Sequence, residues 1–82
     1  MILPTKGITP DRALLTVGAQ VLLLLDEPKT ISRLWHEVQE LRGTLPEVSP
    51  LGFDWFLLSL DFLFIIGAIR LGGGNLLTKV RS

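Results

Sequence analysis

The residues of this chain that are best able to do chemistry are few and widely spaced. His36 is the only histidine, with Glu37 and Glu40 near it on one predicted helix, and cysteine is absent. A metal site or an acid–base pair needs a second imidazole or another convergent group. We therefore expect these side chains to form a solvated helix face.

Two carboxylates, Asp54 and Asp61, are seven residues apart and so lie near one face of a predicted helix. Paired carboxylates can hydrolyse glycosidic bonds when they flank a cleft. A chain of 82 residues has too little bulk for such a cleft, so we expect a polar strip or ion pairs with a partner. We predict that the chain is not an enzyme and has no catalytic residue, metal ligand or cofactor.

A glycine-rich run at 72–75 is followed by Lys79. A P-loop requires GxxxxGK[ST] between a strand and a helix, whereas this lysine lies in a predicted strand. The run therefore predicts a turn. Arg70, Lys79 and Arg81 make the C-terminal segment basic, which favours either solubilising charge or a weak contact with a phosphate backbone.

The sequence predicts a single small domain, residues 1–82. Capping signals and chain breakers divide it into three helices and a hairpin. Thr9-Pro10 and Thr30 are typical helix starts, and Gly43 is a typical C-terminal glycine. Eight basic and eight acidic side chains cancel, so the chain as a whole does not attract nucleic acid. The predicted elements are an extended N-terminal arm over 1–9, helices over 10–26, 30–42 and 50–68, and a hairpin over 69–80.

The first two predicted helices are amphipathic. The inward face of the first is expected to contain Leu14, Gly18, Val21, Leu22 and Leu25. The inward face of the second is expected to contain Ile31, Leu34, Trp35, Val38 and Leu41. Its water-facing side chains are expected to be Arg33, His36, Glu37, Gln39 and Glu40.

The third predicted helix has more apolar residues than one core-facing stripe requires. A predicted core set consists of Phe53, Phe56, Leu57, Leu60, Leu63 and Phe64. A second set, at steps of three, four and three, consists of Trp55, Leu58, Phe62 and Ile65. A chain of this size cannot bury both sets. We predict that the second set, together with Ile2 and Leu3 of the arm, forms a protein interface.

Three helices followed by a hairpin is the order of a winged helix-turn-helix domain, mainly α with a small β-hairpin. In many such domains the third helix reads DNA with basic and amide side chains. Between Phe53 and Ile69 this chain has two acids and no basic residue. The third helix therefore occupies the position of a DNA-recognition helix but lacks the basic side chains that such a helix uses.

Four segments occur in a characteristic order: ILPTK, PDRALL, TISRLW and FDWFLLSLDFLFIIGAI, the last followed by a glycine-containing hairpin. In this the chain resembles the small middle components of bacterial ABC-three-component systems, the group that includes Lamassu-type antiphage defence. The resemblance implies a non-enzymatic adaptor subunit that assembles with an SMC-like ABC ATPase and an effector, often a nuclease. It further implies a role in holding the ATPase heads or coupling them to the effector, with DNA reached through the complex.

Two other functions stay open. A stand-alone winged-helix regulator would bind DNA through its basic hairpin or an unusual face. A small membrane protein would use 51–71 as its span, with Asp61 near the bilayer centre at a cost of roughly 2.5–3.5 kcal/mol. Because the N-terminus lacks signal-peptide features, we favour a cytoplasmic adaptor that has neither a membrane partner nor a small-molecule substrate.

Overall fold

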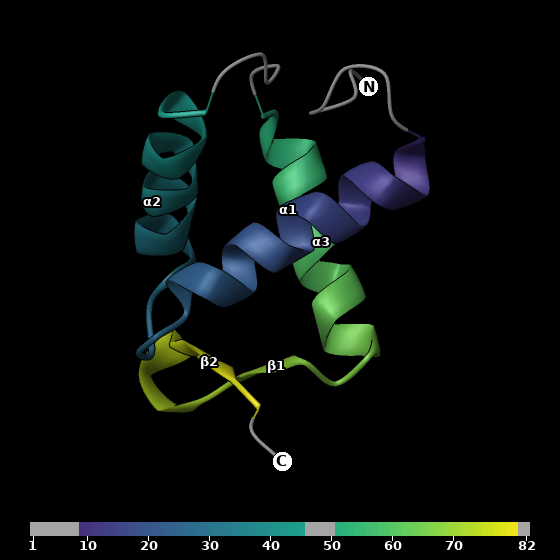
Figure 1. Cartoon of the computed structure of the whole chain (residues 1–82). Coiled ribbons are helices and arrows are strands. Elements are labelled where there is room, and N and C mark those ends of the chain that lie inside the picture. Colours follow the sequence, from purple (N-terminus) through teal and green to yellow (C-terminus); the bar gives the residue numbers. More distant parts are fainter. Residues whose placement is uncertain (1–8, 46–50, 81–82) are drawn as a thin grey trace.

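The computed structural model describes residues 9–45 and 51–80 of the chain. Three helices precede a two-stranded antiparallel hairpin in this part, which confirms a mainly α protein with a small β-hairpin. In Figure 1, α1 crosses α3, while β1 and β2 lie together at the lower end of the view. The elements are α1 (Pro10–Leu24), α2 (Ile31–Gly43), α3 (Phe53–Ile65), β1 (Ile69–Leu71), the 3-10 turn η1 (Gly73–Asn75) and β2 (Leu77–Lys79).

Helix α3 is shorter at both ends than the predicted 50–68, and Gly67 accounts for its C-terminal end. Gly67 has φ +76°, in the left-handed region that glycine adopts without a steric penalty. The amide of Gly67 donates to the Phe64 carbonyl at 3.0 Å, and that of Ala68 donates to the Leu63 carbonyl at 2.8 Å. This pair of bonds is the Schellman motif, which ends the helix and turns the chain into β1.

The starts of the helices agree with the capping signals only in part. The Thr30 hydroxyl accepts a hydrogen bond from the Arg33 amide at 3.2 Å, as a capping residue should. Thr9 occupies the N-cap position of α1, but its side chain makes no capping bond. Gly52 occupies the N-cap position of α3. Helix α2 ends at Gly43, as predicted, but Gly43 has no left-handed φ and so does not form a glycine cap.

The core lies where α1 and α3 cross. Ala13, Val17 and Val21 of α1 are fully buried, and Gly18 is buried beside them. A Cβ at Gly18 would lie 3.4 Å from the Leu63 side chain of α3. The buried face of α1 is thus rotated from the predicted one, because Leu14 and Leu22 are only half-buried.

Aromatic rings connect α2 to the start of α3. The ring of Trp35 lies 5.1 Å from the ring of Phe53 and 5.1 Å from that of Phe56, measured between centroids. Leu34 and Val38 of α2 are fully buried. Ile31, which was expected to face inward, is exposed at the first turn of α2.

The hairpin packs on the helices through its buried residues Ile69 and Leu77. In its register Ile69 pairs with Lys79 and Leu71 pairs with Leu77. Lys29, between α1 and α2, forms an antiparallel bridge to Leu77 with backbone hydrogen bonds of 3.1 and 2.7 Å. The connection between the first two helices therefore anchors the hairpin.

The segment 51–71, considered above as a membrane span, contains a helix of only 13 residues. Within 9–45 and 51–80, no helix has the length and apolar character needed to cross a membrane.

We predict that Gly67→Ala lowers the free energy of unfolding by about 1 kcal/mol, because a Cβ is strained at a left-handed φ. Space is not the cause, since nothing lies within 4 Å of the added Cβ. Urea unfolding followed by tryptophan fluorescence measures the change. Gly73→Ala is the matched control, because Gly73 is equally open and has no positive φ. Equal losses in the two variants would contradict this account of the end of α3.

Candidate protein interface

The buried sector of α3 lies between the two apolar sets that the sequence suggested. Each set contributes to the core from one edge, and neither lies wholly inside or outside it. The sequence interpretation was therefore wrong in treating one set as core and the other as surface. The buried residues are Trp55, Phe56, Ser59, Leu60 and Leu63.

Ser59 is at the centre of this buried sector. Its side chain is fully buried, and its Oγ donates to the Trp55 carbonyl at 2.9 Å. A buried hydroxyl is costly only when it lacks a hydrogen bond, so this bond lets serine occupy a core position.

The four residues predicted as the interface set on α3 have different environments. Leu58 is 41% exposed and Ile65 is 83% exposed, so both are accessible. Phe62 is half-buried and packs against the core. Trp55 is only 7% exposed, so its predicted place on an outward seam is wrong. The indole Nε1 of Trp55 has no hydrogen-bond partner within the described part of the chain.

Three residues expected in the core are instead exposed on the outer face of α3: Phe53, Leu57 and Phe64. The outer face also contains Asp54 near the helix start and Asp61 farther along, both exposed. Asp61 lies among large exposed apolar side chains. We call this group the Asp61 patch, and it consists of Leu57, Leu58, Asp61, Phe64 and Ile65.

Helix α1 has a second exposed apolar surface that the sequence interpretation missed. Leu15 is 55% exposed and Leu23 is 70% exposed, with the exposed Ala19 midway between them. The spacing of four residues places all three on one side of the helix. We call Leu15, Ala19 and Leu23 the α1 stripe. The available signal was the excess of leucines in LLTVGAQVLLLL over what one buried stripe requires.

The two apolar surfaces lie on different helices. Helices α1 and α3 contact each other through buried faces, with Gly18 of α1 against Leu63 of α3. The Asp61 patch and the α1 stripe consist of exposed residues outside that contact. They are therefore two separate surfaces.

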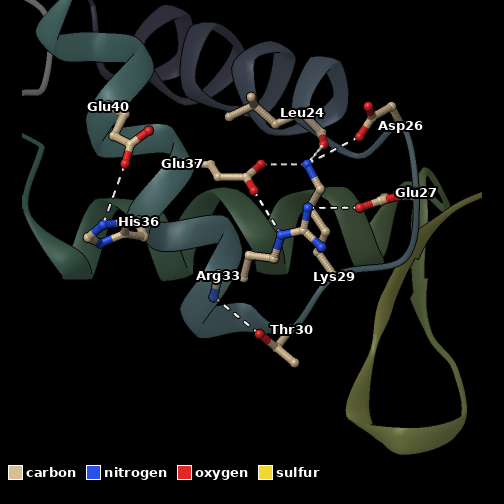
Figure 2. A network of polar contacts seen from close by, with 9 residues as sticks. All are labelled: Leu24, Asp26, Glu27, Lys29, Thr30, Arg33, His36, Glu37 and Glu40. Atoms are coloured by element: carbon tan, nitrogen blue, oxygen red, sulfur yellow. Dashed lines mark hydrogen bonds and ion pairs between the residues drawn. The ribbon is translucent and has the colours of Figure 1, made fainter.

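A polar network between α1 and α2 holds these helices at their angle (Figure 2). The Lys29 side chain is buried, and its Nζ donates to the Leu24 carbonyl at 2.6 Å. The same ammonium forms ion pairs with Glu37 of α2 and, at 3.2 Å, with Asp26. Figure 2 shows Glu37 between Lys29 and Arg33, whose Nε lies 2.8 Å from the second Glu37 oxygen. Glu37 was expected to face water, and this prediction is wrong because the buried Lys29 requires a counter-charge.

The ionisation of this network follows from its hydrogen bonds. The bond from Lys29, followed by that from Arg33, lowers the pKa of Glu37 below its ordinary 4.5. The hydrogen bond with Glu37 raises the pKa of Lys29 above 10.5, in opposition to the effect of its burial. The bond from Lys29 also lowers the pKa of Asp26. All of these groups are consequently charged at neutral pH.

Arg42 is a further buried cation that sequence reasoning missed. It lies at the end of α2, and its Nη1 donates to Gln20 Oε1 of α1 at 3.0 Å. Burial lowers the pKa of this guanidinium below its ordinary value. Arg42 thus ties the C-terminal end of α2 to the middle of α1.

The predicted basic contacts are dispersed. Arg70 is exposed on β1, whereas the Nζ of Lys79 lies 3.4 Å from the Leu22 carbonyl at the end of α1. His36 is exposed and lies 3.5 Å from Glu40, a surface pair with little energetic weight. Three of the predicted contact residues, Ile2, Leu3 and Arg81, lie outside the described residues.

A small, mainly α chain that exposes large apolar side chains on two helices has the surface of a subunit of an assembly. Its sequence matches the family described as ABC-three component (ABC-3C) system Middle Component 6 over residues 3–80. Because the match spans nearly the whole chain, this protein belongs to that family, and its partners are components of such a system. The resemblance inferred from the sequence is confirmed. No curated protein and no solved structure gives a significant match.

We predict that the free energy of unfolding is highest between about pH 5 and pH 10 and falls on either side. Glu37 stabilises the fold above its ordinary pKa of 4.5, and this contribution is lost as the pH falls through the lowered value. The contribution of Lys29 is complete below 10.5 and is lost as the pH rises through its raised pKa. Urea unfolding at a series of pH values measures both effects.

The matched variants for this prediction are Glu37→Gln and Glu40→Gln. Glu37→Gln should reduce the loss of stability in acid, because the group that titrates there is gone. Glu40→Gln should leave the loss unchanged, because Glu40 contacts only the exposed His36 in the described ion pairs. Parallel pH curves for the wild type and Glu37→Gln would show that the network is not the source of the acid sensitivity.

Proposed function

We propose that this protein is a non-catalytic adaptor that connects two other components of its three-component system. The components we propose are an SMC-like ABC ATPase and a nuclease effector, acting in cytoplasmic antiphage defence. Membership of the middle-component family supports this assignment. The adaptor would couple the state of the ATPase to the effector through protein contacts.

The observation that carries the proposal is the pair of exposed apolar surfaces on two different helices, α1 and α3. An adaptor must hold two partners at once, so it needs two separate surfaces. The Asp61 patch provides one and the α1 stripe provides the other. Large apolar side chains such as Ile65 and Leu23 are costly to leave in water and typically mark protein contacts.

We further propose that the architecture is of the winged-helix type. The order of three helices and a hairpin supports this, as does the anchoring of the hairpin at Lys29 between the first two helices. In a DNA-reading member, α3 would present basic groups to phosphates. Here the outer face of α3 presents Asp54 and Asp61, which favours a protein partner over DNA.

We predict that the tagged chain, co-expressed with the other components of its own system, recovers both of them on affinity purification. Ile65→Glu should lower the recovery of one component at least tenfold, because a charge replaces an apolar contact. Leu23→Glu should lower the recovery of the other component by a similar factor. Quantitative mass spectrometry of the eluates measures both.

The control is His36→Glu, which adds the same charge at an exposed position of α2 and should leave both recoveries unchanged. Circular dichroism of each purified variant checks that the helices are retained. Recovery of neither component by the wild type would refute the adaptor proposal. If the wild type also shifted a DNA duplex in a gel, the stand-alone regulator would replace it.

A further inference from the structure

We propose that the Asp61 patch is a socket for a single cationic side chain of a partner protein, an arginine or a lysine surrounded by apolar groups. This inference rests on the proposed adaptor function and specifies the chemistry of one of its contacts. It is drawn from the position of one carboxylate relative to four apolar side chains on α3.

The four apolar residues of the patch surround Asp61 on the helix surface. Leu57 and Leu58 precede it by four and three residues, and Phe64 and Ile65 follow it by three and four. Positions three and four residues apart are neighbours on a helix, so all four side chains flank the carboxylate. All four are exposed, by 39, 41, 39 and 83% in chain order. The exposed charge therefore sits inside an apolar ring.

Within the described ranges 9–45 and 51–80, Asp61 has no ion-pair partner and no evident structural role. It also lies outside the first turn of α3, so the helix dipole does not favour a negative charge there. The fold alone does not account for an aspartate at this position.

Asp54 provides an internal comparison on the same face. It lies in the first turn of α3, where a negative charge is favoured by the dipole. Its Oδ1 accepts a hydrogen bond from the Trp55 amide at 2.9 Å. The start of the helix thus explains Asp54, which leaves Asp61 as the acid on this face that is available to a partner.

The apolar ring determines which partner fits. When a surface closes over the ring, water is excluded and the local dielectric falls, so a charge pair inside the ring becomes stronger than on an open surface. A desolvated carboxylate without a counter-charge would oppose binding. The partner must therefore supply a cation at the centre and apolar atoms around it.

The same argument disfavours the other occupants. In a symmetric dimer through this patch, the two copies of Asp61 would face each other as like charges in a desolvated contact. A nucleic acid would bring phosphates against Asp54 and Asp61. Charge complementarity selects a protein segment with an arginine or a lysine among apolar residues.

The test uses the component that the wild-type chain binds in its co-expressed system. Its Kd for the wild type and for variants is measured by biolayer interferometry at 150 mM salt. Asp61→Asn removes the charge at nearly constant shape and should raise the Kd at least tenfold. Asp61→Arg places like charges together and should raise it at least a hundredfold. The matched controls Glu40→Gln and Glu40→Arg, on the exposed side of α2, should each change the Kd less than twofold.

Thermal unfolding of the isolated variants separates binding from folding. Asp61→Asn and Asp61→Arg should melt at about the same temperature as the wild type, because the exposed Asp61 forms no ion pair within the described ranges. A melting temperature lowered by several degrees would assign Asp61 a structural role and overturn the inference.

The remaining outcomes distinguish this inference from the adaptor proposal. If the wild type binds a component and the Asp61 variants bind it equally well, the socket is wrong and the adaptor stands. If the wild type binds no component, both are wrong. If sedimentation shows that the wild type forms a dimer that the Asp61 variants do not form, the occupant is a second copy and the inference is overturned.

Discussion

One buried ammonium group determines how the parts of this chain fit together. Lys29 lies in the short connection between α1 and α2, and its Nζ contacts the last carbonyl of α1 and the Glu37 carboxylate of α2. Its backbone pairs with Leu77 of β2. Burial of a charge is unfavourable unless acceptors surround it, so this position fixes the surrounding elements together. Lys29 thus connects the end of α1, the side of α2 and the second strand of the hairpin at one point.

Features governed by neighbouring residues were predictable from the sequence. The Thr30 cap, the glycine-rich turn and the buried Leu34 and Val38 of α2 follow from local preferences and helical periodicity. Helix α3 shows where periodicity stops being informative, because apolar residues occur on nearly every side of it. Periodicity gave the angle between its two apolar sets but not the direction of the core. In the structure the core lies on the side of Ser59, and solvent lies on the side of Asp61. Both residues are polar, and the sequence does not show that Ser59 is the one whose hydroxyl is hydrogen-bonded inside the helix.

Contacts between distant segments were not predictable in the same way. The pairing of Lys29 with Glu37 depends on how α2 folds back after the connection, and the contact of Arg42 with Gln20 joins positions on different helices. No local pattern marks either cation as buried. The exposed leucines of α1 were overlooked for a different reason: the predicted inward face left out Leu15 and Leu23, but no interface was assigned to them. In each case the deciding quantity was three-dimensional packing.

The exposed apolar faces of this chain have a consequence for its life in the cell. A newly made copy without partners presents Leu23 and Ile65 to water, and such surfaces promote aggregation and recognition by quality-control proteases. Partners that cover these faces would also protect the chain from aggregation and proteolysis. The amount of subunit that persists would then follow the amount of its partners, and an excess copy would be short-lived. Surface chemistry of this kind can balance the stoichiometry of an assembly without any dedicated regulator.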